Sequence, residues 1–478
     1  MKSTLIALVV LMGQTAVAQQ PAKFIDPSNM DLSVKPGDNF YLYVNGNWIK
    51  NTPVPASKTR WGTFDQLADE SSNALKGLLQ DASTYKGSNS LMKRIGDFYA
   101  SGMDSVRIEK LGYQPIKPFL NKINEIKNKE GVMKIVGYLR SNAVASPLIN
   151  VGVGQDARLA YKYVVGISQG GISLPDRDYY LKEDARSKEA RAALKKYIID
   201  LFTLTGTDAE DAEQKANEIL KMETSIASAQ LSRVDMRDPV KMYNKMTLNE
   251  LISKSPHLDW PAFFKTLGYN STIDTVVVSQ PAFVSFTDSL LENISLGAWK
   301  TYLQWNVLRD NAANLSSKFV NANFDYNKVL TGQKVQTPRW ERMSRLIDRQ
   351  LGELLGQLYV QKYFKPEAKK RMHELVANME RTYEVRIKKL DWMTDATKLK
   401  ALEKLHTYIN KIGYPDVWKD YKGVVINRND FLANVKSAAK WQYDDRLSKL
   451  NKPVDKTEWG MTPPTVNAYY SPQKNEIV

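Results

Sequence analysis

Cysteine is absent from the 478-residue sequence, and histidine occurs only three times. Without cysteine the chain has no disulfide scaffold, no thiolate metal site and no N-terminal cysteine for lipid attachment. The histidines, His257, His373 and His406, are never four residues apart, so no helix presents two imidazoles one turn apart. His373 and Glu374 begin like the metal-binding pattern His-Glu-x-x-His, but Ala377 occupies the position of the second ligand. We therefore expect His373 to be an ordinary helix residue and this helix to bind no metal ion.

The sequence also lacks the motifs of several other chemistries. It contains no Gly-x-Ser-x-Gly nucleophile elbow, no phosphate-binding loop and no dinucleotide-binding fingerprint. The net charge is +15, but the basic residues are scattered among acids and form no block, zinc finger or RNA-recognition signature. We therefore expect a solvated basic surface and no nucleic-acid partner.

Pairs of carboxylates are numerous, and two of them lie in turns. Asp176 and Asp178 flank Arg177, and Asp238 follows Arg237 and precedes a proline. These turns are typical of structural ion pairs and caps, and a catalytic acid and base is the alternative interpretation. The residues alone therefore show no recognisable catalytic apparatus.

A long apolar run opens the chain. Lys2 precedes the apolar residues 5–12, and the small residues Ala16 and Ala18 follow. This pattern predicts a secretory signal peptide over residues 1–18, cleaved after Ala18. The run is too short to span a bilayer, so we expect no stable membrane insertion after cleavage. An exported chain of this size without disulfides fits a bacterial periplasm or the extracellular space.

The middle of the chain predicts helices. Turn formers and aromatics fill residues 36–65, and this density of proline and glycine predicts an irregular segment without a long helix. From Leu67 to about residue 450, apolar residues recur at helical spacing, with helices expected around 187–204, 209–230 and 343–363. We therefore predict a mainly α fold, a large multi-helical lobe with irregular or β segments at both ends.

Two of these helices are predicted to form a hairpin. Pro366 opens the first, and a second apolar stripe ends at Gly413 with Pro415 just beyond. The first stripe comprises Val376, Met379, Tyr383, Ile387 and Leu390, and the second comprises Leu402, Leu405, Ile409 and Ile412. Spacings of three and four residues place each stripe on one helix face.

The last residues predict a β-hairpin. A run of β-branched and aromatic residues at 466–470 is followed by a turn cluster at 471–475 and a second short strand at 476–478. At an exposed sheet edge, the free backbone groups and the amide of Asn467 are suited to hold an extended peptide by strand addition. An ordinary hairpin without a ligand is the alternative.

Eight short segments occur in a characteristic order along nearly the whole mature chain. They are residues 38–48, 60–64, 96–99, 174–180, 237–239, 392–393, 412–416 and 466–470. Together they resemble the neprilysin and endothelin-converting-enzyme family of zinc metalloendopeptidases, in particular its bacterial oligopeptidase members. The resemblance implies a two-lobed, mostly helical ectoenzyme with an active site between the lobes that admits peptides rather than folded proteins.

The resemblance also assigns roles to four residues. It implies that Asn467 and Ala468 hold the substrate backbone and that Arg60 lies near the C-terminal side of the substrate, where a guanidinium can pair with a carboxylate. It implies that Phe64 forms an aromatic wall for the residue after the scissile bond. Ala68 stands where neprilysin has a second arginine, which argues against a strong preference for a free substrate C-terminus.

Zinc is implied for the complete enzyme. In the family, the His-Glu-x-x-His helix and a downstream glutamate ligand follow the Asn-Ala hairpin, and the sequence stops before such a helix. We therefore expect the N-terminal portion of an exported zinc metalloendopeptidase, truncated before the zinc-binding helix, with no catalytic residue, no bound zinc and no activity alone.

The expected division of the chain follows from the same resemblance. Residues 1–18 form the signal peptide, 19–75 an irregular segment that packs against a thermolysin-like catalytic lobe, 76–455 the helical lobe, and 456–478 the start of the catalytic lobe. The alternative function is an exported, non-catalytic helical protein that binds peptides or glycans through its 24 tyrosines and 10 tryptophans.

Overall fold

The computed structural model describes residues 25–478, which form two compact units, one ending at Pro55 and one from Ala56 to Val478. The predicted signal peptide over residues 1–18 lies outside the described residues. Among the helices of residues 25–478, none combines the length and the hydropathy that a membrane span requires.

The first unit contains a 3-10 turn, Pro27–Asn29, and the helix α1, Phe40–Asn51. The expectation of an irregular chain over residues 36–65 is therefore wrong for this stretch. Asn39 does not break the helix but caps it, because its side chain accepts a hydrogen bond from the Leu42 N–H at 3.0 Å. The flanking Pro36 and Pro53 lie outside both helix ends. Inside the helix, Gly46 leaves room for Asp31, which a Cβ at that position would contact.

The second unit is mainly helical, as predicted. Its helix α2, Thr63–Thr84, begins inside the segment 19–75 that was expected to be irregular. The other helices are α3 Ser90–Met103, α4 Ser105–Leu111, α5 Lys117–Asn124, α6 Glu130–Ser141, α7 Asp178–Leu181, α8 Ala185–Leu204, α9 Ala209–Ser228, α10 Leu248–Lys254, α11 Trp260–Thr266, α12 Pro281–Asn293, α13 Leu296–Asn311, α14 Ser317–Thr331, α15 Arg339–Tyr363, α16 Pro366–Lys388, α17 Asp395–His406 and α18 Phe431–Leu447.

Two small sheets accompany these helices. The first has the strand order β1-β2-β4-β3, with β1 Ile149–Gln155 antiparallel to β2 Tyr163–Gln169, β2 parallel to β4 Thr275–Val278, and β3 Asn244–Thr247 antiparallel to β4. The second has the order β5-β7-β6 and comprises only two residues per strand, at Ile409–Asn410, Glu476–Ile477 and Tyr470–Ser471. Strands of two residues are not stable by themselves, so contacts with the rest of the protein must stabilise the second sheet.

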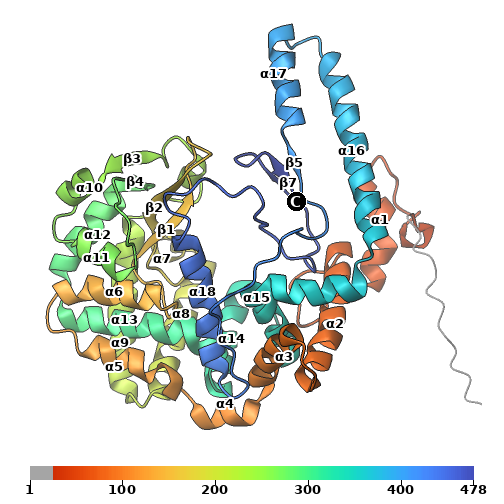
Figure 1. The fold of residues 1–478 in the computed structure, drawn as a ribbon. Helices are drawn as coiled ribbons and strands as arrows, with labels where there is room; N and C mark the ends of the chain where they lie inside the picture. Colours follow the sequence, from red (N-terminus) through yellow and green to blue (C-terminus); the bar gives the residue numbers. More distant parts are fainter. Residues whose placement is uncertain (1–24) are drawn as a thin grey trace, which may run out of the picture. The chain divides into compact units, whose positions relative to one another are not determined.

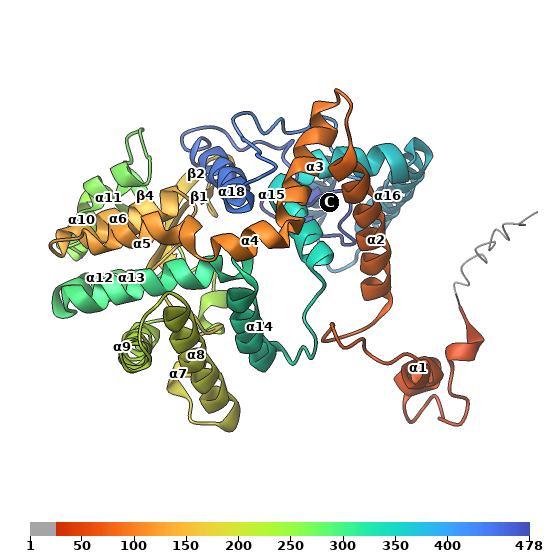
Figure 2. The same cartoon turned by 90° about the horizontal axis from the view of Figure 1, so that it is seen from below.

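The helices of the second unit surround two separate hydrophobic clusters. The larger is centred on α13, whose Trp299, Tyr302 and Trp305 are fully buried. Figure 2 shows α13 between α5 and α6 on one side and α8 and α9 on the other. Most side chains of α13 are buried, whereas its polar residues Lys300, Gln304 and Asp310 are partly or fully exposed. The smaller cluster joins α2, α3 and α15, with Leu79 and Phe98 fully buried.

The predicted helical hairpin is present, with one correction. Helices α16 and α17 pack side by side (Figure 1), and α16 begins at Pro366 as expected. However, α16 ends at Lys388 and α17 at His406, so Leu390, Ile409 and Ile412 lie beyond the helices whose apolar stripes were expected to include them. The Ile409 N–H instead donates to the Asn475 carbonyl at 2.9 Å, within the strand pairing of β5 with β7. Ile409 and Ile412 have helical spacing in the sequence, but Ile409 forms a strand because β7 lies next to it in the fold.

Candidate functional site

The predicted C-terminal hairpin is confirmed, although its regular strands are short. Strands β6 and β7 are antiparallel, and beyond them Tyr469 and Val478 exchange two backbone hydrogen bonds of 3.1 and 2.9 Å. The turn is anchored by Asn475, whose φ is +50° and whose side-chain amide donates to the Lys404 carbonyl at 2.9 Å. The hairpin is therefore fastened to the end of α17.

A buried ion pair holds the centre of this sheet. Lys411 and Glu476 are paired, and their side chains are only 4% and 2% exposed. Lys411 also donates to the carbonyl of Glu458 at 2.6 Å. Because β7 is flanked by β5 and β6, the remaining edge of β6 is the side of this hairpin that has no strand partner.

Asn467 and Ala468 are exposed and lie just before β6, not within it. The Ala468 N–H donates to Oδ1 of Asn467 at 2.9 Å, and the Asn467 N–H donates to the Thr465 carbonyl at 3.1 Å. Within residues 25–478, no hydrogen bond engages the Asn467 Nδ2 group or the carbonyls of Asn467 and Ala468. These groups are therefore free to pair with an extended chain.

Helix α15 positions the segment that leads to Asn467. The hydroxyl of Thr462 donates to Oδ2 of Asp348 at 3.1 Å. Thr462 and Pro463 lie directly against Gly352 and Gly356, where any Cβ would collide with them. The helix is kinked at the preceding residue, Leu351, with φ −129° and ψ 39°. Two glycines at this spacing are not recognisable in the sequence as a docking face, because only the fold brings the later segment to them.

Asp348 is the most perturbed acid near this segment. Burial raises its pKa from 3.8 to about 6, and the hydrogen bond from Thr462 only partly offsets that rise. Its Oδ1 is buried and has no hydrogen-bond partner among the described residues. The ionised carboxylate of Asp348 therefore destabilises the folded protein, and it lies beside the segment that leads to Asn467.

Arg60 lies just before α2 and Phe64 lies in its first turn, and both are largely exposed. The Arg60 side chain is 85% exposed, with its Nε 3.5 Å from Oδ1 of Asp65, and Phe64 is 67% exposed. Across the described part of the chain, no hydrogen bond, ion pair or ring contact joins either residue to Asn467 or Ala468. Their roles therefore stay predictions.

His257, His406 and the turn carboxylate Asp176 have side-chain partners. His257 lies in a turn, with Nδ1 2.7 Å from Oδ2 of Asp288, and this hydrogen bond raises the pKa of His257. His373 lies on α16 and His406 ends α17. Asp176 pairs with Arg233 at 3.1 Å. The interpretation of the turn carboxylates as structural ion pairs is confirmed for Asp176.

Residues 25–478 contain no group of three or more histidine, aspartate or glutamate side chains arranged to hold a metal ion.

Comparison with known proteins decides the family. Residues 36–415 match the model of the N-terminal part of peptidase family M13. The chain belongs to peptidase family M13. This M13 chain is 29% identical to bovine (Bos taurus) endothelin-converting enzyme 1 over 468 residues and 30% identical to the endothelin-converting enzyme homolog of Locusta migratoria over 478 residues. Each alignment covers 94% of this chain, but only 62% and 65% of the relatives. The resemblance stated from the sequence motifs is therefore confirmed.

Solved structures show the same fold. The inhibitor complex of the Mycobacterium tuberculosis zinc metalloprotease Zmp1 superposes with a TM-score of 0.87 at 34% identity, covering 95% of this chain and 69% of that one. PepO from Lactobacillus rhamnosis superposes with a TM-score of 0.83 at 23% identity, covering 93% of this chain and 70% of that one. The M13 chain spans somewhat under two thirds of the length of the two curated relatives described above. Its mainly α architecture is that of this family.

Proposed function

We propose that this chain supplies the helical lobe and a peptide-holding edge of an exported zinc metalloendopeptidase that hydrolyses oligopeptides. The observation that carries the proposal is the exposed Asn467–Ala468 segment beside the open edge of β6, in a chain of family M13. The similar Zmp1 of Mycobacterium tuberculosis is a zinc metalloprotease, which supports the same class of reaction. Export to a bacterial periplasm or the extracellular space is part of the proposal.

The free groups of the edge match the backbone of a substrate. An extended peptide presents alternating N–H and C=O groups, which pair with a strand edge by main-chain hydrogen bonds. The Asn467 Nδ2 group donates to a peptide carbonyl, and the Ala468 carbonyl accepts from a peptide N–H. These hydrogen bonds involve only the backbone of the bound peptide and not its side chains. The edge therefore holds peptides of many sequences.

Arg60 and Phe64 are proposed to contact the substrate on the C-terminal side of the scissile bond. Among residues 25–478, the exposed guanidinium of Arg60 pairs only with Asp65, at 3.5 Å, so it is available for a substrate carboxylate. The exposed ring of Phe64 offers apolar area to the side chain after the scissile bond. Zinc is proposed for the complete enzyme, and we propose that residues 1–478 by themselves bind peptide without cleaving it.

The reaction is tested with the full product of the gene that encodes this sequence. A quenched fluorescent oligopeptide should be cleaved, a zinc chelator should abolish cleavage, and added Zn²⁺ should restore it. Tight binding of the peptide without cleavage by the zinc-loaded protein would instead support the non-catalytic peptide-binding alternative.

The edge is tested by Asn467→Ala in the same protein. We expect kcat/KM to fall roughly tenfold, mainly through a higher KM, because the amide contacts substrate before and during reaction. Gln473→Ala is the matched control, since this exposed residue lies in the turn of the same hairpin. Equal kinetics for the wild type and Asn467→Ala would remove Asn467 from the substrate site.

A further inference from the structure

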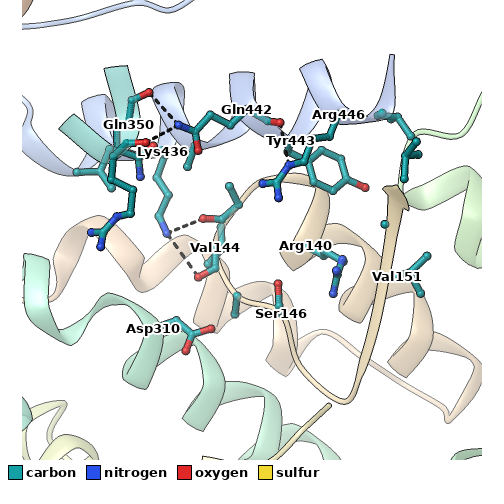
Figure 3. A pocket seen from close by; sticks show the side chains of 18 of the residues that line it. Arg140, Val144, Ser146, Val151, Asp310, Gln350, Lys436, Gln442, Tyr443 and Arg446 are labelled. Carbon is teal, nitrogen blue, oxygen red and sulfur yellow. Dashed lines mark hydrogen bonds between the residues drawn. The ribbon is translucent and has the colours of Figure 1, made fainter. Parts of the chain in front are cut away.

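A polar cavity of about 470 Å³ lies among α6, β1, α15, α18 and the end of α13, and no residue of the C-terminal hairpin lines it. Figure 3 shows its labelled side chains converging from these elements. The charged residues that line it are Arg140, Asp310, Arg349, Lys436 and Arg446. The cavity volume is ample for a small molecule.

The charges around this cavity do not balance. Four cations face one carboxylate, Asp310, and that carboxylate already pairs with Arg309 at 2.7 Å. None of the four cations lies within 4.0 Å of a carboxylate among the described residues. The two tyrosines in the lining, Tyr269 and Tyr443, have pKa values raised by burial, so they are neutral at physiological pH. The cavity is therefore positively charged.

The three arginines retain most of their donors, and Lys436 retains one. Lys436 donates to the carbonyls of Ala143 and Val144 at 3.0 and 3.5 Å. Arg140 donates through Nη1 to the Ile149 carbonyl at 3.3 Å. Arg446 donates through Nε to its own helix, to the Gln442 carbonyl at 3.3 Å.

Arg349 makes no side-chain hydrogen bond within residues 25–478. Burial lowers the pKa of Arg140, and it lowers the pKa of Lys436 to about 8. Cations that are partly desolvated without a carboxylate destabilise the protein unless an anion joins them.

A second, independent feature points into the same cavity. Gln350 lines it, is only 8% exposed, and its Oε1 has no hydrogen-bond partner among the described residues. A buried acceptor without a donor is uncommon in native proteins and indicates an unfilled partner position. The complete ligand therefore carries a negative charge for the cations and a hydrogen-bond donor for Gln350.

We propose that this cavity binds a phosphate group that also bears a hydroxyl, either as inorganic hydrogen phosphate or on a small molecule such as glycerol phosphate. The phosphate oxygens accept hydrogen bonds from the arginines, which are suited to bidentate contacts, and from Lys436. The hydroxyl donates to Oε1 of Gln350. This site is independent of the peptide-holding edge, and its ligand is not a peptide.

The test is isothermal titration of the purified chain with inorganic phosphate, sulfate and glycerol phosphate at constant ionic strength and pH 7. Phosphate should bind, and sulfate, which has no hydroxyl at this pH, should bind roughly tenfold more weakly. The tighter of inorganic phosphate and glycerol phosphate identifies the form of the ligand. Sulfate binding as tight as phosphate would overturn the assignment of Gln350.

Variants separate a built site from general basicity. Arg349→Gln with Arg446→Gln, two exposed cations of the cavity, should weaken phosphate binding tenfold or more. Arg345→Gln with Lys440→Gln is the matched control, because it removes the same charge from the same two helices outside the cavity. Unfolding temperatures verify that both double variants fold. Equal weakening in both would show non-specific attraction and overturn the proposal.

Discussion

At the residue scale, the structure explains motifs by contacts that the sequence does not show. The turn at residues 174–180 is organised by Glu223, which is fully buried on α9. The Ser173 hydroxyl donates to Oε1 of Glu223 at 2.7 Å, and the Trp305 ring N–H donates to the same oxygen at 3.2 Å. The hydroxyl of Tyr180 also bonds Glu223 and accepts the Leu174 N–H at 2.9 Å. The aromatic end of this motif is therefore structural.

Asp348→Asn should stabilise the protein at neutral pH. The folded pKa of about 6 lies above the ordinary 3.8, so the stabilisation from this carboxyl is complete below about pH 4 and is lost as pH rises through 6. An amide avoids that loss and still accepts the hydrogen bond from Thr462. We expect the free energy of unfolding at pH 7.5 to rise by about 1–3 kcal/mol, and the gain to vanish near pH 4.

Urea denaturation of both proteins at pH 7.5 and pH 4 measures this difference. The control is Asp416→Asn, because the Asp416 side chain is 94% exposed. A gain for Asp348→Asn that is the same at both pH values would show that the carboxyl charge is not its cause.

At the scale of elements, helices follow local pattern while the short strands follow their neighbours. Helices α8 and α9 run over 185–204 and 209–228, close to the predicted 187–204 and 209–230. Strand β5 escapes prediction because its two residues have a strand conformation only through pairing with β7. Helix α1 escapes it because the turn formers around it, Asn39 among them, cap the helix instead of breaking it.

The buried pair Lys411–Glu476 should hold the C-terminal sheet together. Lys411→Met leaves the carboxylate of Glu476 buried and unpaired, so we expect a loss of about 3 kcal/mol in the free energy of unfolding. The double change Lys411→Met with Glu476→Leu removes both charges and should lose less. Chemical denaturation measures both values, and hydrogen exchange at Ile409 and Ile477 reports whether the sheet opens. A double variant less stable than Lys411→Met would contradict this account.

At the scale of the whole molecule, the second unit contains two hydrophobic clusters where the sequence predicted one helical lobe. Helix α18 contributes to both, with Leu432 in the larger cluster and Phe431 and Val435 in the smaller. The M13 family match extends over residues 36–415 and does not itself reveal this division.

We expect the two hydrophobic clusters to lose their protection from amide hydrogen exchange separately. Leu355→Ala creates a cavity in the smaller cluster, where Leu355 is fully buried, and should cost about 2–5 kcal/mol. Hydrogen exchange should accelerate in α2, α3 and α15 before α8, α9 and α13. Ile198→Ala, in the larger cluster, is the reciprocal control and should show the opposite order. Uniform acceleration in both variants would indicate a single cooperative core.

The mainly α class, the two-helix hairpin, the C-terminal β-hairpin and the family were all predictable from the amino-acid sequence, because periodicity, turn formers and ordered motifs are local properties of the chain. The absence of cysteine is equally informative, since it excludes disulfides and leaves core burial as the main source of stability. Which segments meet was not predictable in this way and depends on the three-dimensional fold. It placed Thr462 on the glycines of α15, paired β5 with β7, and gathered four cations from three helices around one cavity. Such contacts join residues far apart in sequence, and no local pattern encodes them.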